Sequence, residues 1–131
     1  MPWWPARFSF RAADLVANGD WSLNSGHQGA ARLLAREPGL RGLFAASDLM
    51  AAGAIDALRE AGRRVPDDVA VVGFDNSAAA TRVTPALTTM RNPIEQTALE
   101  ALRILDDQIA GRVRPPVHLL LSSELVERDS G

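Results

Sequence analysis

The chain has 131 residues, of which 47% are apolar and 23% are charged, with a net charge of -2 and no cysteine. This length and apolar content suffice for one domain with a buried core. The composition argues against a basic surface for nucleic acid, excludes disulfide and thiolate sites, and offers no apolar run near the ~20 residues that a membrane helix needs.

Three short apolar runs in the first half of the chain predict strands. Each is followed shortly by an aspartate, and the runs lie at 15–17, 43–46 and 69–74. The last run is apolar at consecutive positions, which is typical of a parallel strand buried on both faces. The residues before the first run, 1–13, mix tryptophan, proline and arginine without a period, and we interpret them as an irregular lead-in to a folded part spanning 14–131.

Helical periods follow the first two runs. One helix is predicted from a cap at Ser22 to residues 37–39, and another from Asp48 to Gly62, where a left-handed residue is favoured. Strand–helix–strand–helix–strand order within one sheet gives parallel strands. The pattern therefore predicts an α/β fold with a doubly wound parallel sheet, in which the run at 69–74 is central.

The second half of the chain contains one strong helix signal. Asn92 as a cap and Pro93 at the first helical position predict a long helix over 93–110, which Gly111 ends. The other predicted elements are one or two helical turns at 78–82 and extended segments at 87–90, 117–121 and 125–128.

The aspartates that follow the three runs indicate a ligand site. Because the carboxyl ends of parallel strands meet at one edge of a sheet, we expect Asp20, Asp48 and Asp75 to face one cleft, where open α/β sheets bind small molecules. Asp20 also suits a turn beside Trp21. The two histidines are far apart in the sequence and no glycine-rich phosphate motif occurs, so neither a metal site nor a cofactor is expected.

Five segments occur in a specific order with specific gaps: GDWSLNSG at 19–26, ASDLMAAGA at 46–54, VPDDVAVVGFDN at 65–76, TPALTT at 84–89 and SELVER at 123–128. Together they resemble the lactose- and galactose-repressor family of bacterial transcription regulators. The resemblance runs from about residue 14 to the end. It matches the carboxyl-terminal part of the two-lobed, periplasmic-binding-protein-like effector domain, whereas the family's helix-turn-helix and most of its first lobe have no counterpart in this sequence.

The resemblance implies a binding site for a small-molecule effector, commonly a sugar, nucleoside or base, between the two lobes. Trp21 matches an aromatic position that packs on the effector, although a half-buried packing role is the alternative. Ser47 stands where the family usually has asparagine. Asp48 is either an effector ligand or a helix cap, and Asp75 matches the family's most characteristic effector-binding acid.

Three classes of function are compatible with an acidic cleft. The resemblance favours the effector-binding part of a cytoplasmic transcription regulator, without its DNA-binding domain. A sugar-binding solute receptor of a transporter is the alternative, but it would be exported, and the N-terminal residues lack the apolar core of a secretion signal. A receiver-type phosphoacceptor or another enzyme is not expected, because that type needs a lysine and the chain has none.

The long helix predicts an assembly. In the family the segment matching 93–110 packs on the other lobe, most of which has no counterpart here. Its apolar stripe would then lack cover; the stripe comprises Ile94, Ala98, Ala101, Leu102, Leu105 and Ile109. An apolar face of this length is unfavourable in water, so we expect a homodimer or larger oligomer, in which this helix either packs against a neighbouring chain or folds back onto its own sheet in a position that the family does not use.

Overall fold

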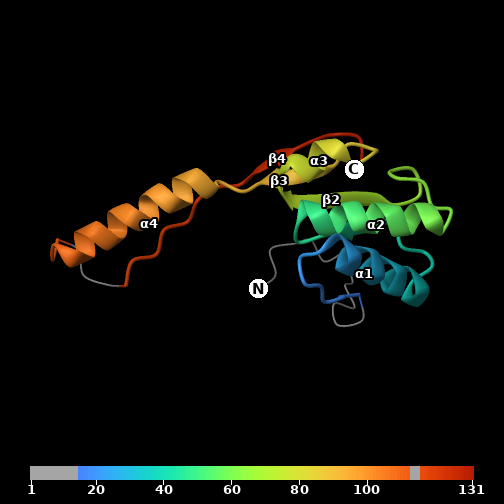
Figure 1. Cartoon of the computed structure of the whole chain (residues 1–131), viewed down its shortest axis with the longest axis horizontal. Helices are drawn as coiled ribbons and strands as arrows, with labels where there is room; N and C mark the ends of the chain where they lie inside the picture. The colour runs from blue at the N-terminus through green and yellow to red at the C-terminus, as the bar shows by residue number, and fades with distance from the viewer. Residues whose placement is uncertain (1–14, 113–115) are drawn as a thin grey trace, which may run out of the picture.

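The computed structural model describes residues 15–112 and 116–131 and shows an α/β body with one long projecting helix (Figure 1). The elements, in chain order, are α1 (Leu23–Arg36), β1 (Gly42–Phe44), α2 (Asp48–Glu60), β2 (Ala70–Asp75), α3 (Ala78–Arg82), β3 (Thr88–Arg91), α4 (Ile94–Ile109) and β4 (Glu124–Val126). All four predicted helices are confirmed. The segment 1–13 lies outside the described residues.

The four strands form one sheet in the order β1-β2-β3-β4. The first three run parallel, with Leu43 of β1 opposite Val71 of β2 and Val72 opposite Thr88 of β3. The last strand, β4, pairs antiparallel with β3. The sheet is therefore mostly parallel, as predicted, with β2 in its interior and one antiparallel edge strand.

The core lies between α2 and the sheet. The helix turns Ala51, Ile55 and Leu58 inward, each at most 1% exposed, against Val71 and Leu87. Full burial of a large aliphatic side chain contributes roughly 1.5–3 kcal/mol, so this contact fixes α2 on the sheet.

Two glycines bring α1 and α2 unusually close. A Cβ placed on Gly53 of α2 would lie 2.0 Å from the Leu23 carbonyl oxygen of α1. Reciprocally, a Cβ on Gly26 of α1 would lie 2.0 Å from the Met50 carbonyl oxygen of α2. Each helix thus uses a residue without a side chain where the backbone of the other passes.

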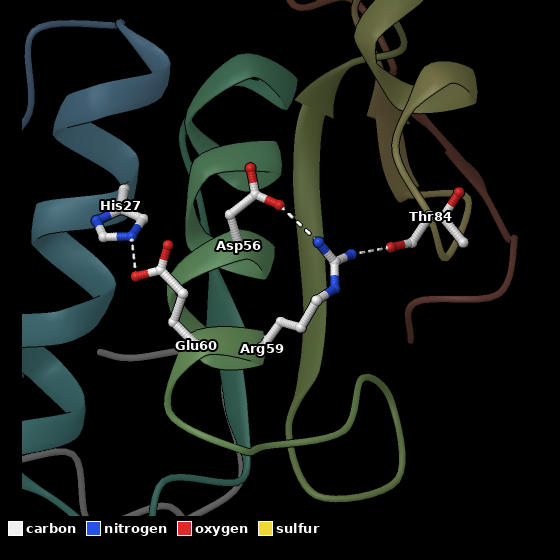
Figure 2. A network of polar contacts seen from close by, with 5 residues as sticks. All are labelled: His27, Asp56, Arg59, Glu60 and Thr84. Carbon is white, nitrogen blue, oxygen red and sulfur yellow. Dashed lines mark hydrogen bonds and ion pairs between the residues drawn. The ribbon is translucent and has the colours of Figure 1, made fainter.

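Polar contacts on the outer surface link α1, α2 and the turn at Thr84 (Figure 2). His27 Nε2 of α1 lies 2.9 Å from Glu60 Oε2 of α2. Arg59 donates both to Asp56 Oδ1, at 2.9 Å, and to the carbonyl oxygen of Thr84, at 2.6 Å. Exposed ion pairs contribute roughly 0–1 kcal/mol, so the glycine contacts rather than these pairs determine how closely the helices pack.

Ser130, near the end of the chain, bridges the start of β2 and the start of β3 by hydrogen bonds. Ser130 is fully buried; its hydroxyl donates to the carbonyl oxygen of Val71 at 2.7 Å and accepts from the backbone N–H of Thr88 at 2.8 Å. The Ser130 carbonyl oxygen accepts from the Val71 N–H at 2.7 Å. Ser130 therefore takes the place of a ladder bond where the two strands diverge.

Two predicted strands are wrong. Residues 15–17 form no strand, because Leu15, Val16 and Ala17 line a groove beside β1 instead of pairing with a neighbouring strand. Residues 117–121 also form none: the chain there returns toward the body, and pairing with β3 begins only at Glu124 (Figure 1).

The helix α4 projects from the body, and none of its residues is buried (Figure 1). Leu102 is 64% exposed and Ile109 is 78% exposed. The expected fold-back onto the sheet is therefore not observed. The predicted cap also differs: Pro93 occupies the cap position without a side-chain hydrogen bond, because the Asn92 side chain bonds to Asp75 instead. Gly111 follows the helix with φ of +70°, as expected for its end.

Within residues 15–112 and 116–131, no helix combines the length and the apolar character needed to cross a membrane.

Candidate functional site

The predicted site residues lie at one end of the sheet. The amino ends of α1 and α2 and the carboxyl end of β2 point to the side of the body from which α4 departs (Figure 1). This is the edge at which parallel α/β sheets bind ligands. The structure therefore brings Trp21, Ser47, Asp48 and Asp75 to the same end, through three different elements.

Trp21 is held outward by the turn that begins α1. Its side chain is 64% exposed, and its φ of 71° is unusual for a bulky residue. Asp20 Oδ1 accepts from the Ser22 N–H at 3.0 Å, and the Asp20 N–H donates to Ser25 Oγ at 3.1 Å. Ser22 in turn caps α1 by accepting from the Ser25 N–H. These bonds fix the backbone on both sides of the indole.

The same turn accounts for Asp20. Hydrogen bonds from the Ser22 hydroxyl and backbone N–H, and from the Ser25 hydroxyl, lower the pKa of Asp20 to about 2. The carboxylate stays charged throughout the physiological range and stabilises the turn, which agrees with the turn role considered from the sequence.

Ser47 and Asp48 have different roles at the start of α2. Ser47 is the helix cap, with its hydroxyl oxygen accepting from the Met50 N–H at 3.2 Å. Asp48 is the first helical residue and only 1% exposed; its two oxygens accept from the Thr89 hydroxyl and the Ser77 N–H. The carboxylate thus joins α2 to β3 and α3. Space for it exists because Gly73 of β2 lacks a Cβ, which would lie 2.6 Å from Asp48 Oδ1.

Asp75 ends β2 in a strained turn. Its φ is 108°, and that of Asn76 is 56°. One carboxylate oxygen accepts from Asn92 Nδ2 at 3.3 Å, and no described residue hydrogen-bonds to the other. The side chain is half-buried, so an acceptor remains available at the end of the sheet.

Three residues that the sequence reasoning missed hold this turn. Arg128 donates to Asn76 Oδ1 at 2.6 Å and to the Leu87 carbonyl oxygen at 2.7 Å. Thr89 accepts from the Asn76 N–H at 3.4 Å while donating to Asp48. All three residues, Asn76, Thr89 and Arg128, stand within segments that resemble the repressor family, and this resemblance was the available signal.

Backbone strain is concentrated at this end of the body. Trp21, Asp75 and Asn76 are the non-glycine residues with positive φ in the described parts of the chain. Such conformations cost roughly 1–3 kcal/mol each and persist where surrounding contacts enforce them, often at ligand sites. The strain falls on two of the four residues that the sequence selects, Trp21 and Asp75, and on Asn76.

Comparisons with known proteins identify the family of the chain. Residues 6–131 match the periplasmic binding protein-like domain family. The chain belongs to this family. It is 44% identical over 117 residues to the transcriptional regulator CelR of Thermobifida fusca, covering 89% of this chain and 34% of CelR. A solved CelR–cellobiose complex superposes with a TM-score of 0.81 at 44% identity, covering 86% of this chain and 35% of that chain.

A lac repressor dimer bound to operator and to the anti-inducer ONPF is also similar, with a TM-score of 0.78 at 31% identity over 86% of this chain and 39% of that chain. The resemblance to the lactose- and galactose-repressor family is confirmed, and the chain corresponds to an effector-binding fragment of such a regulator. It spans about a third of the length of the curated relatives it matches. These relatives are transcription regulators rather than enzymes, and the solute-receptor alternative is not favoured.

Proposed function

We propose that this chain recognises a small polyhydroxylated effector on behalf of a cytoplasmic transcription regulator whose DNA-binding part lies outside it. The proposal rests mainly on one observation: the exposed Trp21 ring and the available Asp75 oxygen lie at the same end of a fold similar to a regulator solved with cellobiose. No catalytic step and no cofactor is part of this role.

Each site residue has a distinct proposed part. Trp21 offers a flat, partly apolar ring to the C–H face of a sugar. Asp75 accepts hydrogen bonds from hydroxyl groups, and the Ser47 hydroxyl donates one while its oxygen caps α2. Asp48 has a structural part rather than a direct contact with the effector, because its two oxygens already accept from Thr89 and Ser77 and so hold the start of α2 in place. Ser47 has a shorter reach than the asparagine usual in the family, which favours an effector placed closer to α2.

An effector can regulate such a protein when it binds one relative arrangement of the two lobes with higher affinity than another. An effector held between this lobe and a second lobe stabilises the arrangement that it fits better, and so changes the affinity of a distant DNA-binding part. We further propose that the working assembly is a dimer, as in the lac repressor structure.

Cellobiose titration of the isotopically labelled chain, followed by NMR, tests the site. One lobe supplies only part of the contacts, so we expect a dissociation constant on the order of millimolar, with the largest shift at the Trp21 indole N–H. Asp75→Asn should weaken binding by about 1–3 kcal/mol, roughly 5- to 150-fold, because it removes the negative charge and replaces one of the two acceptor oxygens with an NH2 donor.

The matched control is Asp106→Asn on α4, which removes one carboxylate far from the proposed site and should leave the affinity unchanged. A nucleoside titrated in parallel distinguishes a sugar site from a base site. Equal affinity of the wild type and Asp75→Asn for whichever probe binds would remove Asp75 from the proposed site.

A further inference from the structure

Two successive residues of the turn after β2 are each held by a distant side chain. The Asp75 carboxylate accepts from Asn92 Nδ2, between β3 and α4, at 3.3 Å. The Asn76 side chain accepts from Arg128, which follows β4, at 2.6 Å. Both residues of the turn have positive φ, 108° and 56°, so the conformation persists only where such contacts enforce it.

Arg128 reaches this turn with both of its terminal nitrogens in use. Nη2 donates to Asn76 Oδ1, and Nη1 donates at 2.7 Å to the carbonyl oxygen of Leu87, the residue before β3. The backbone N–H of Arg128 donates to Thr88 Oγ1 at 2.9 Å. A guanidinium is planar and rigid, so this pair of bonds fixes the Asn76 side chain relative to the backbone that enters β3.

The arginine provides the stronger of the two contacts that hold Asn76. Thr89 Oγ1 accepts from the Asn76 N–H at 3.4 Å, which is long for a hydrogen bond, whereas the bond from Arg128 is 2.6 Å long and has a charged donor. Hydrogen bonds with a charged partner are roughly twice as strong as neutral ones, and their free energy is of the same order as the strain of one such residue. Loss of the arginine would therefore leave the strain at Asn76 without its main compensation.

We propose that Arg128 is a positioning residue for the effector site. By holding Asn76 at positive φ, it keeps the Asp75 carboxylate at the end of β2 where an effector hydroxyl can reach it. The inference rests on the proposed function, because it concerns the same acceptor. Arg128 acts through Asn76 rather than on the effector. A merely structural arginine, which only joined the end of β4 to the start of β3, would leave the turn unchanged when removed.

The shape of the turn can be measured without a ligand. A positive φ brings the amide proton and the α proton of one residue close together, so Asp75 and Asn76 should each show a strong intraresidue nuclear Overhauser effect (NOE) in the labelled 131-residue chain. Arg128→Met keeps an unbranched apolar stem and removes both donors. In this variant both NOEs should weaken to the strength that the extended residues of β2 show.

Cellobiose titration then connects the turn with the site. Arg128→Met and Asn76→Ala should each weaken binding about tenfold. The double variant should bind no more weakly than either single variant, because both substitutions remove the same hydrogen bond. Asn76→Asp keeps an acceptor for Arg128 and tolerates the left-handed region, so it should retain both NOEs and bind within about twofold of the wild type.

The matched control is Arg59→Met on the outer surface. Arg59 also donates to one side chain, that of Asp56, and to one backbone carbonyl oxygen, that of Thr84 (Figure 2). The substitution removes the same charge and the same number of bonds away from the turn. It should change neither the two NOEs nor the affinity for cellobiose.

Each outcome decides the proposal. Unchanged NOEs in a folded Arg128→Met overturn it, and so does an altered turn that binds cellobiose as tightly as the wild type. Additive losses in the double variant also overturn it, because Arg128 would then act by a route other than Asn76. If Arg128→Met does not fold, weakened NOEs and affinity in Asn76→Ala but not in Asn76→Asp support the proposal, and equal behaviour of these two variants overturns it.

Failure of the proposed function gives a different result. If the wild type binds neither cellobiose nor the nucleoside, the effector site is refuted. The NOEs of the free chain still decide whether Arg128 sets the shape of the turn at Asp75 and Asn76.

Discussion

The helices α2 and α4 have similar lengths, 13 and 16 residues, and both show an apolar stripe, yet their surroundings are opposite. Eight residues of α2 are buried and none of α4 is. The buried face of α2 includes small residues, such as Ala51, Gly53 and Ala57, which let a second helix and a sheet approach closely. The exposed stripe of α4 includes large residues, such as Leu102 and Leu105, which need a partner with room to receive them. An amphipathic period therefore predicts a helix, whereas residue size indicates the kind of surface that can cover it.

Gly53→Ala should have the largest effect on the tightly packed region. The new Cβ would lie 2.0 Å from the Leu23 carbonyl oxygen, so α1 and α2 must move apart. We expect a loss of about 2–3 kcal/mol in the free energy of unfolding, measured by urea denaturation, despite the better helix propensity of alanine.

The matched control for this prediction is Gly29→Ala in the neighbouring helix. Its Cβ would lie 3.5 Å from Ala17 Cβ, an ordinary contact, so helix propensity should dominate and the variant should be up to about 1 kcal/mol more stable. Equal destabilisation by both substitutions would show that close packing of α1 on α2 is not what makes Gly53 necessary.

Sequence patterns predicted the local features of the body and missed the contacts between residues that are far apart in the sequence. The cap at Ser22 and the helix end at Gly62 depend on neighbouring residues, and both occur as predicted. The strand predicted at 69–74 also forms, as Ala70–Asp75, but it is not buried on both faces: Val71 and Gly73 are buried, whereas Ala70, Val72 and Phe74 are partly exposed. The bond between Arg128 and Asn76 spans 52 positions and leaves no local signature.

The two wrong strands have the same physical origin. Residues 15–17 and 117–121 have suitable side chains, but a strand forms only where the backbone pairs with that of a neighbouring strand, and neither segment does so. For the site, the sequence predicted that the candidate residues lie together at one end of the sheet, which is where the structure has them. It could not distinguish the buried, fully bonded Asp48 from Asp75, whose second oxygen no described residue contacts, because that difference arises from Thr89 and Ser77.

The second prediction concerns α4, whose covering partner was expected from the sequence to be a neighbouring chain. Leu102→Glu places a charge in the exposed stripe and should convert a dimer or larger assembly into a monomer in light scattering across a dilution series. The free energy of unfolding of the body should change by less than about 0.5 kcal/mol, because Leu102 makes no buried contact there.

Gln96→Glu, an exposed change on the same helix, is the control for added charge and should leave the assembly intact. A wild-type chain that scatters as a monodisperse monomer at micromolar concentration would contradict the assembly. A monomer would leave the stripe of α4 in water.

The smallest expected effect is the loss of stability when one surface carboxylate is removed, compared between the body and α4. The Arg64 guanidinium lies 2.9 Å from Asp68 Oδ1, and its hydrogen bonds lower the pKa of Asp68 from 3.8 to about 2. A lowered folded-state pKa stabilises the protein above the unfolded pKa, and this contribution is lost as the pH falls from about 4 to 2. Asp68→Asn should therefore be less stable than the wild type at neutral pH, and the gap should close across this range.

The control is Asp107→Asn, which breaks the 2.7 Å contact with Arg112 at the end of α4. Because that helix is not packed on the body, the variant should unfold like the wild type at every pH. Thermal unfolding at closely spaced pH values measures both variants. A difference between wild type and Asp68→Asn that persists undiminished at pH 2 would show that its origin is not electrostatic.

The position of Ser130 has a consequence for synthesis on the ribosome. Its hydroxyl bonds to Val71, 59 positions earlier, and to Thr88, 42 positions earlier. The parallel strands β2 and β3 leave the exit tunnel first, but their diverging ends have no partner until residue 130 emerges. Non-local contacts of this kind form slowly and late. The backbone groups of Val71 and Thr88 that bond to Ser130 therefore lack this partner in the nascent sheet until residue 130 has emerged.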